Sequence, residues 1–125
     1  MSQVYLRGLR GAITIEENSK KAIQQGTREL LLELVDANDL VTEDIASVFF
    51  SVTPDLNADF PAYTARELGW LGVPLMCFRE IDVPGALPMC IRVLIHVNTG
   101  KAQDEMVHVY LGGATSLRPD LSSRT

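Results

Sequence analysis

The stretch Cys90–Asn98 reads CIRVLIHVN, and its alternation decides the fold class. Successive residues of a strand point to opposite sides of a sheet. The residues expected on one side are all aliphatic: Ile91, Val93, Ile95 and Val97. The other side carries Arg92, Leu94 and His96. The pattern predicts a strand with one face in a hydrophobic core and the other face outside it.

Four more segments are rich in the residues that strands favour. They are Val4–Ala12, Ile45–Thr53, Val73–Phe78 and Val107–Leu111. In an alternative that the residues leave open, the last strand continues past Gly112-Gly113 to Leu117. In the first strand, Gly8 and Gly11 allow a close backbone approach or a bulge.

One long helix is expected after the first strand. Asn18 or Ser19 can cap its start, and it should end near Asn38. Apolar residues recur at helical spacing along it: Ile23, Leu30, Leu31, Leu34 and Val35. Shorter helical pieces are expected from Thr42 and over Phe60–Trp70. The chain is therefore expected to form a single α/β (or α+β) domain, residues 1–125, with one sheet.

So few helices cannot cover both faces of one sheet. Exposed apolar sheet surface is expected to be buried between subunits, which predicts an oligomer. The last segment, residues 118–125, combines Pro, Ser and charge, and we expect it to be a mobile C-terminal tail.

Composition excludes several classes of partner. The net charge of −5 leaves no basic excess for binding nucleic acid. The longest apolar runs are strand-sized, so no membrane span is expected. The N-terminus lacks the pattern of a secretory signal, and Cys77 and Cys90 form no CxxC pair, so a cytoplasmic protein is expected.

The basic residues are eight arginines and only three lysines. Arginine offers a planar fork of donors that matches carboxylates. Arg7 and Arg10 are three residues apart on one strand and should point to opposite faces. Arg92 lies in the most apolar strand, where an unpaired guanidinium is costly to bury. A carboxylate partner, a bound anion and a solvated cleft all remain open for it.

The other reactive residue types point away from covalent chemistry. Cys77 and Cys90 have the pattern of core residues, and His96 and His108 are too few and too poorly spaced to hold a metal. Phosphate-loop, serine-hydrolase and zinc-protease motifs are absent. Glu80 lies just past a predicted strand end, where sites tend to form. We expect binding or electrostatic catalysis, with no metal and no cofactor.

Several blocks of residues resemble one family. They are Arg7–Thr14 (RGLRGAIT), Ser51–Ala58 (SVTPDLNA) with Phe60-Pro61-Ala62, Ala65–Leu68, Val73-Pro74, Arg79–Val83 (REIDV), Cys90–Val93 (CIRV), His108–Leu111 (HVYL) and Leu117–Leu121 (LRPDL). In this order, over nearly the whole chain, they are similar to monofunctional chorismate mutases of the trimeric pseudo-α/β-barrel class. The resemblance implies a five-stranded mixed sheet packed by one long and several short helices. It also implies a homotrimer with active sites in clefts between subunits.

The resemblance implies an isomerase that converts chorismate to prephenate, on the route to phenylalanine and tyrosine. Arg92 matches the cation at the ether oxygen of the breaking bond, and Glu80 matches the carboxylate that receives the ring hydroxyl. Arg10 and Tyr110 match groups that hold the substrate. The further substrate-binding residues that it implies are Cys77 beside the hydroxyl contact, Phe60, Arg66, Met76, Leu117 and Arg118.

This chain departs from the pattern at two positions. Tyr63 stands where relatives can carry a lysine, and Met76 stands where a polar residue can occur. The chemistry itself fits the central residues, because a unimolecular rearrangement needs no nucleophile or cofactor. It needs a held conformer and stabilisation of the charge that develops as the C–O bond breaks. Two alternatives remain: a non-catalytic trimeric binder of small carboxylate metabolites, and a different enzyme acting on a dicarboxylate or enol ether.

Overall fold

The computed structural model describes residues 3–118 and has an α+β fold built on one mixed sheet. The strands are β1 (Tyr5–Thr14), β2 (Ile45–Val52), β3 (Leu75–Arg79), β4 (Cys90–Thr99) and β5 (Val109–Leu111). Their order across the sheet is β3-β2-β4-β1-β5. The central strand β4 is antiparallel to both of its neighbours, whereas the outer pairs β2–β3 and β1–β5 are parallel. The predicted fold class is confirmed.

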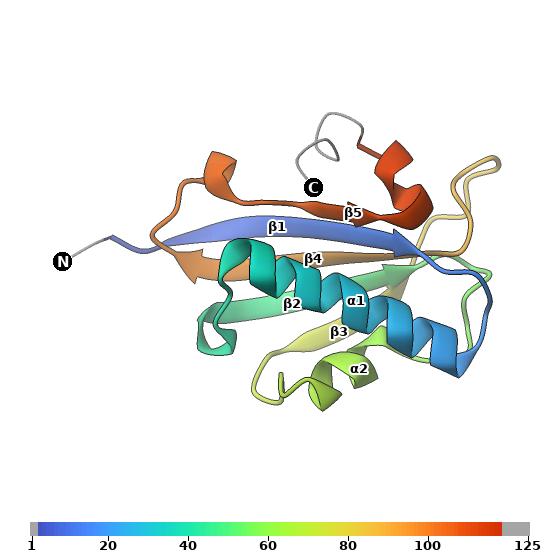
Figure 1. The fold of residues 1–125 in the computed structure, drawn as a ribbon, viewed down its shortest axis with the longest axis horizontal. Coiled ribbons are helices and arrows are strands. Elements are labelled where there is room, and N and C mark those ends of the chain that lie inside the picture. Colours follow the sequence, from blue (N-terminus) through green and yellow to red (C-terminus); the bar gives the residue numbers. More distant parts are fainter. Residues whose placement is uncertain (1–2, 119–125) are drawn as a thin grey trace.

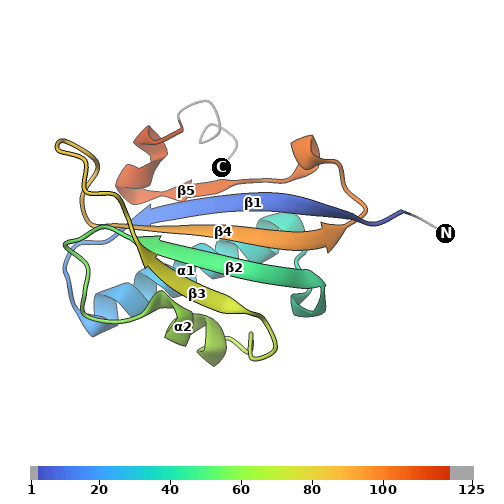
Figure 2. The same ribbon diagram turned by 180° about the vertical axis from the view of Figure 1, so that it is seen from behind.

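Both helices, α1 (Lys20–Asn38) and α2 (Pro61–Glu67), lie on the same side of the sheet (Figure 1). Seen from behind, the strands stand in front and α1 lies beyond them (Figure 2). We call this second side, which neither α1 nor α2 covers, the open face. Three short 3-10 helices, η1 (Thr42–Asp44), η2 (Gln103–Glu105) and η3 (Gly112–Ser116), complete the fold.

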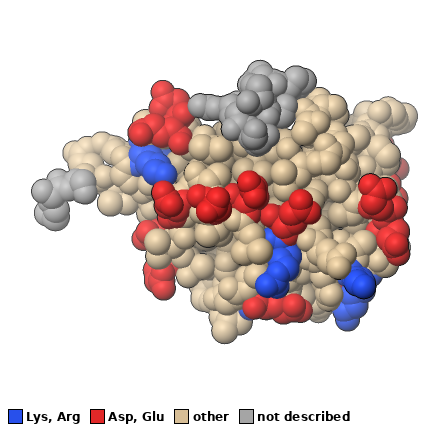
Figure 3. All heavy atoms as spheres, viewed as in Figure 1, with Lys and Arg blue, Asp and Glu red and all other residues tan. Residues whose placement is uncertain are grey.

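The long helix forms where its cap and its apolar spacing predict it. Ser19 caps the start, and its Oγ accepts a hydrogen bond from the Ala22 N–H at 3.1 Å. At the other end Asp39 adopts a left-handed conformation and its N–H closes the last turn on Val35. The buried face of α1 packs on the sheet. Figure 3 shows acidic side chains in a row over α1, whose exposed acids include Glu29, Glu33 and Asp36.

Gly11 sets how closely α1 approaches β1. A Cβ atom at this position would lie 2.8 Å from Cδ1 of Leu34 and 3.1 Å from Cδ1 of Leu30. Any larger residue would push the helix away from the strand. The expected close approach in this strand is therefore found at Gly11, whereas a Cβ at Gly8 would meet nothing within 4 Å.

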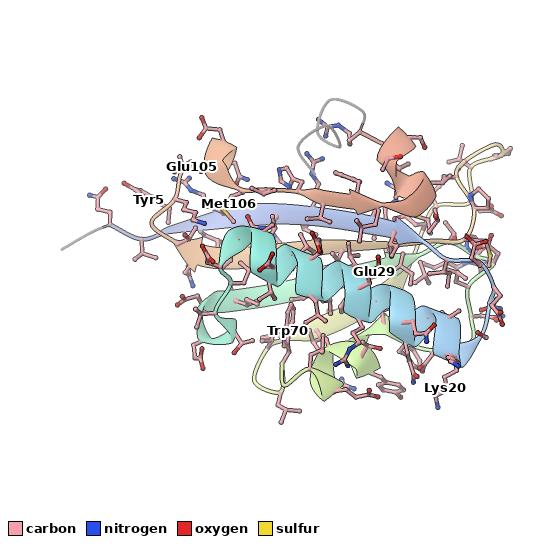
Figure 4. All side chains as sticks on the ribbon, viewed as in Figure 1. Tyr5, Lys20, Glu29, Trp70, Glu105 and Met106 are labelled. Carbon is pink, nitrogen blue, oxygen red and sulfur yellow. The ribbon has the colours of Figure 1, made fainter. Side chains whose placement is uncertain are left out.

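The core lies between the helices and the aliphatic side of the sheet. In β4 the predicted alternation is confirmed, because Ile91, Val93, Ile95 and Val97 are all buried there. Trp70, which follows α2, and Met106, near the C-terminal end of α1, are also buried in this core (Figure 4). The open face remains partly apolar and accessible, and Leu94 and Phe78 are exposed on it.

The chain departs from the predicted elements at its C-terminal end. The alternative strand to Leu117 is wrong, because residues Gly112–Ser116 form η3. Gly112 has a φ of 59°, which turns the chain out of the sheet. The predicted tail begins at Arg118, the last residue described, and the rest of it lies outside the described residues.

Candidate active site

The strand register builds the site as a row of side chains across the open face. Tyr110 on β5 is level with Ala12 on β1, and Ala12 is level with Arg92 on β4. The same row continues from Arg92 to Ser51 on β2. Because Ala12 is small, it leaves space between Tyr110 and Arg92. The next row begins with Arg10, two residues before Ala12 on β1.

Glu80 reaches this row from the edge of the sheet. Its N–H donates to the Val52 carbonyl at 2.8 Å, so the β2–β3 ladder continues one residue past β3. The Ser51 hydroxyl donates to Glu80 Oε1 at 2.6 Å. The same Oε1 lies 3.6 Å from Nε of Arg92, which makes an ion pair between half-buried side chains. Arg92 therefore has its carboxylate partner and also faces a cavity.

These groups line a cavity of about 330 Å³ on the open face. Its lining includes six of the residues that the sequence assigns to the site: Arg10, Glu80, Arg92, Tyr110, Leu117 and Arg118. Pockets for small molecules usually measure about 300–1,000 Å³. Three cations, one carboxylate and one phenol therefore meet in a space at the small end of that range.

Arg10 is fixed through its backbone. Its N–H donates to Nδ1 of His108 at 3.0 Å, just before the β1–β5 ladder begins at Gly11 and Val109. His108 is buried, whereas the Arg10 side chain is exposed at the cavity. The backbone is thus held while the guanidinium remains accessible to a ligand.

The C-terminal segment closes one side of the cavity. The Thr14 Oγ1 accepts a hydrogen bond from the Gly113 N–H at 2.8 Å, which fixes η3 beside β1. Leu117 then packs against a small buried cluster: Ala12, Cys90, Tyr110 and Ala114. This packing brings Leu117 and Arg118 to the cavity wall.

Three other predicted residues lie around α2, away from this cavity. Phe60 and Cys77 line a depression of about 550 Å³, and Arg66 joins them in a smaller adjoining one. The Arg66 guanidinium lies 5.6 Å from the centre of the Tyr63 ring, and Tyr63 also contacts Phe60 edge to face. We call these two adjoining hollows together the α2 depression.

Phe78 is the link between the two regions, because it lines both the open-face cavity and the α2 depression. Met76 is exposed on β3 and lines neither the cavity nor the α2 depression. Cys77 was expected beside the Glu80 contact, yet within one chain the two residues line different hollows.

Both thiols are protonated groups at neutral pH. Burial raises the pKa of Cys77, although a backbone hydrogen bond from Ala62 and the charge of Arg66 partly oppose it. Burial also raises the pKa of Cys90, and the nearby Arg92 guanidinium opposes that rise. A raised pKa leaves little thiolate, so neither residue is prepared as a nucleophile.

Sequence reasoning missed Ser51 and Ala12 as parts of the site. Ser51 is the first residue of the SVTPDLNA block, but nothing in the sequence shows that its hydroxyl meets Glu80. Ala12 contributes by its small size, which no chemical motif signals.

A membrane-spanning helix was not expected from the sequence. None of the helices in the part of the chain that the structure describes has the length and apolar character that a membrane span requires.

Comparison with known proteins identifies the family. The family model described as chorismate mutase type I matches residues 6–121. The chorismate mutase AroH of Thermus thermophilus is 53% identical over 119 residues, which cover 94% of this chain and 98% of that protein. The AroH protein of Bacillus subtilis is 47% identical over 118 residues, covering 94% and 93%. A chorismate mutase structure from Clostridium thermocellum superposes with a TM-score of 0.86 at 49% identity, covering 87% of this chain and 97% of that one.

Proposed function

This chain belongs to the chorismate mutase type I family and functions as a chorismate mutase, and from that premise we propose how its residues divide the work. The reaction is an intramolecular isomerisation of chorismate to prephenate, a step of aromatic amino acid biosynthesis. The observation that carries the proposal is the Arg92–Glu80 ion pair at 3.6 Å, set in one cavity with Arg10 and Tyr110.

Arg92 acts on the transition state. As the C–O bond of chorismate breaks, negative charge develops on the ether oxygen. A guanidinium fixed on a central strand meets that charge without having to reorganise, which lowers the barrier. Because Arg92 is paired with Glu80, the protein does not hold an isolated cation there before substrate binds.

Glu80 is the second catalytic residue, whereas Arg10 and Tyr110 bind and orient the substrate. The Glu80 carboxylate accepts a hydrogen bond from the ring hydroxyl. Arg10 and the Tyr110 hydroxyl contact the substrate carboxylates and hold the compact conformer from which the bond forms. Leu117 and Arg118 support the same cavity from its C-terminal wall. An acidic protein can bind this dianion because the local field is positive.

We propose that the active enzyme is a homotrimer whose sites lie between subunits. Two observations support this. Apolar side chains are exposed on the open face, including Met76, Phe78 and Leu94. The residues expected around the substrate also fall into two separate groups on one chain. In a trimer, the α2 depression of one subunit supplies Phe60, Arg66 and Cys77 beside the cavity of the next.

The direct test follows the loss of chorismate absorbance and the acid conversion of product to phenylpyruvate. We expect prephenate to form without added metal or cofactor. The mass in solution, measured by light scattering, should be three times that of one chain. Absence of prephenate at micromolar enzyme would instead favour a non-catalytic carboxylate binder. Cytoplasmic location stays a proposal, which cell fractionation tests.

A further inference from the structure

Ser51 occupies a position that the proposed chemistry does not yet use. It lies on β2, directly opposite Arg92 on β4 and level with Phe78 on β3. Its side chain points to the open face and lines the cavity. The Ser51 hydroxyl donates to Oε1 of Glu80 at 2.6 Å, which is a short hydrogen bond to a carboxylate.

The ion pair beside this bond is loose. Arg92 Nε is 3.6 Å from Glu80 Oε1, whereas a charge-assisted N–H···O bond is usually about 2.7–2.9 Å long. Nε is buried and has no hydrogen-bond partner among the described residues. An arginine and a glutamate this close would normally contract into a direct bond. The Ser51 bond ties this shared oxygen to β2.

We propose that Ser51 is a positioning residue that holds Glu80 away from Arg92. This inference rests on the roles proposed above for Glu80 and Arg92. With Oε1 occupied by Ser51, the second carboxylate oxygen is directed to the substrate. The guanidinium of Arg92 keeps its N–H groups available for the ether oxygen.

The effect of Ser51 should fall mainly on the chemical step. In the proposed mechanism, substrate carboxylates bind through Arg10 and Tyr110, whereas the Ser51 hydroxyl bonds Glu80. If Glu80 closes on Arg92, the guanidinium is already neutralised when charge develops on the ether oxygen. Transition-state stabilisation then decreases while ground-state binding changes little, which lowers kcat more than KM.

The experiment compares three variants at Ser51 and Ser47. Ser51→Ala removes the donor and should lower kcat about 10-fold, with a much smaller change in KM. Ser51→Thr keeps a hydroxyl on a residue suited to strands and should restore most of the loss. Ser47→Ala is the matched control, because Ser47 lies on the same strand, bonds His96 at 3.0 Å and does not line the cavity. It should keep wild-type kcat.

A structure of Ser51→Ala gives a reading that does not depend on turnover. We expect the Arg92–Glu80 separation to contract from 3.6 Å to about 2.9 Å. An unchanged separation, or a kcat equal to wild type, would overturn the inference. Glu80→Ala distinguishes a failure of the proposed role of Glu80 from a failure of the proposed role of Ser51. If Glu80→Ala keeps full kcat, the proposed role of Glu80 fails. If Glu80→Ala is impaired and Ser51→Ala is not, only the role of Ser51 fails.

Discussion

The open-face cavity and the α2 depression lie on either side of Phe78 but are built by different means. The cavity takes Tyr110, Arg92 and Ser51 from paired strands, whose register fixes their spacing. The α2 depression takes Phe60 and Arg66 from a loop and a seven-residue helix. Ladder hydrogen bonds hold a group more rigidly than a short helix does. In the proposed mechanism, Arg92, which meets the reacting atom, is thus held by the strand ladder, whereas Phe60 and Arg66 are not.

The largest effect should come from removing the Arg92 guanidinium. Arg92→Ala should lower kcat about 10²–10³-fold, because removal of one preorganised donor at a developing oxyanion typically lowers kcat by that factor. Arg92→Lys should recover part of the loss, since it restores charge without the fork. Arg28→Ala, on the exposed side of α1, is the control. Steady-state kinetics with folded protein checks this, and near-normal turnover by Arg92→Ala would remove Arg92 from its proposed role.

The second prediction tests whether the open-face cavity and the α2 depression of one site come from different subunits. Arg66→Glu reverses a charge of the α2 depression and should lower kcat/KM about 10-fold, mostly through KM. Measured as kcat/KM at substrate concentrations far below KM, co-expression of Arg66→Glu with Arg92→Ala should restore about a quarter of the wild-type activity, because random mixing gives that share of intact interfaces. Activity no higher than the mean of the separate variants would place both halves of each site on one chain.

A smaller effect is expected from the phenol of the cavity. Tyr110→Phe keeps the ring that packs with Ala12 and Leu117 but removes one hydrogen bond to a substrate carboxylate. KM should rise about 5- to 10-fold and kcat should change less, because this hydrogen bond stabilises the bound substrate and the transition state about equally. Isothermal titration with a dicarboxylate analogue should show the same loss of affinity. A fall in kcat with unchanged KM would move Tyr110 to the chemical step.

The smallest effect concerns stability in alkali. Burial raises the pKa of Cys90 from 9.0, so the folded chain keeps this proton after the unfolded chain has lost it. The free energy of unfolding is therefore unaffected below the unfolded pKa and falls as pH rises from it through the folded pKa. Urea unfolding between neutral pH and pH about 10 should show this decline. Cys90→Ala should flatten the slope, and an equally steep slope would assign the decline to other groups.

The sheet and the long helix were predictable because their signals are local. The alternation in Cys90–Asn98 and the helix cap at Asn18 or Ser19 each depend on neighbours in the sequence. The structure confirms the strand, as Cys90–Thr99, and places the cap at Ser19. The path of Gly112–Ser116 was not predictable in this way. A continued strand was left open at Gly112. The observed turn is held in part by a hydrogen bond from Gly113 to the Thr14 hydroxyl, which is nearly a hundred residues away in the chain.

The candidate site also contains features that the sequence predicts and features that only the three-dimensional structure shows. Resemblance was sufficient to name Arg10, Glu80, Arg92 and Tyr110, and the structure brings all four to one cavity. The resemblance could not show that Cys77 and Glu80 line different hollows within one chain. The order of motifs along the sequence does not say where each hollow lies on the sheet. Nor could it show the Ser51–Glu80 bond, which depends on the parallel register of β2 and β3.

The tripeptide Arg10-Gly11-Ala12 has a consequence for divergence within such sequences. Arg10 and Ala12 line the open-face cavity, while a Cβ atom at Gly11, between them, would meet Leu30 and Leu34 of the helix. A lineage that acquires a side chain at position 11 requires Leu34 and Leu30 to shift or to become smaller; otherwise the strand moves, and Arg10 and Ala12 move with it. Positions 11, 30 and 34 should therefore covary. Substitutions in the helix, on the opposite side of the sheet, then limit which residues can be accommodated next to Arg10 and Ala12.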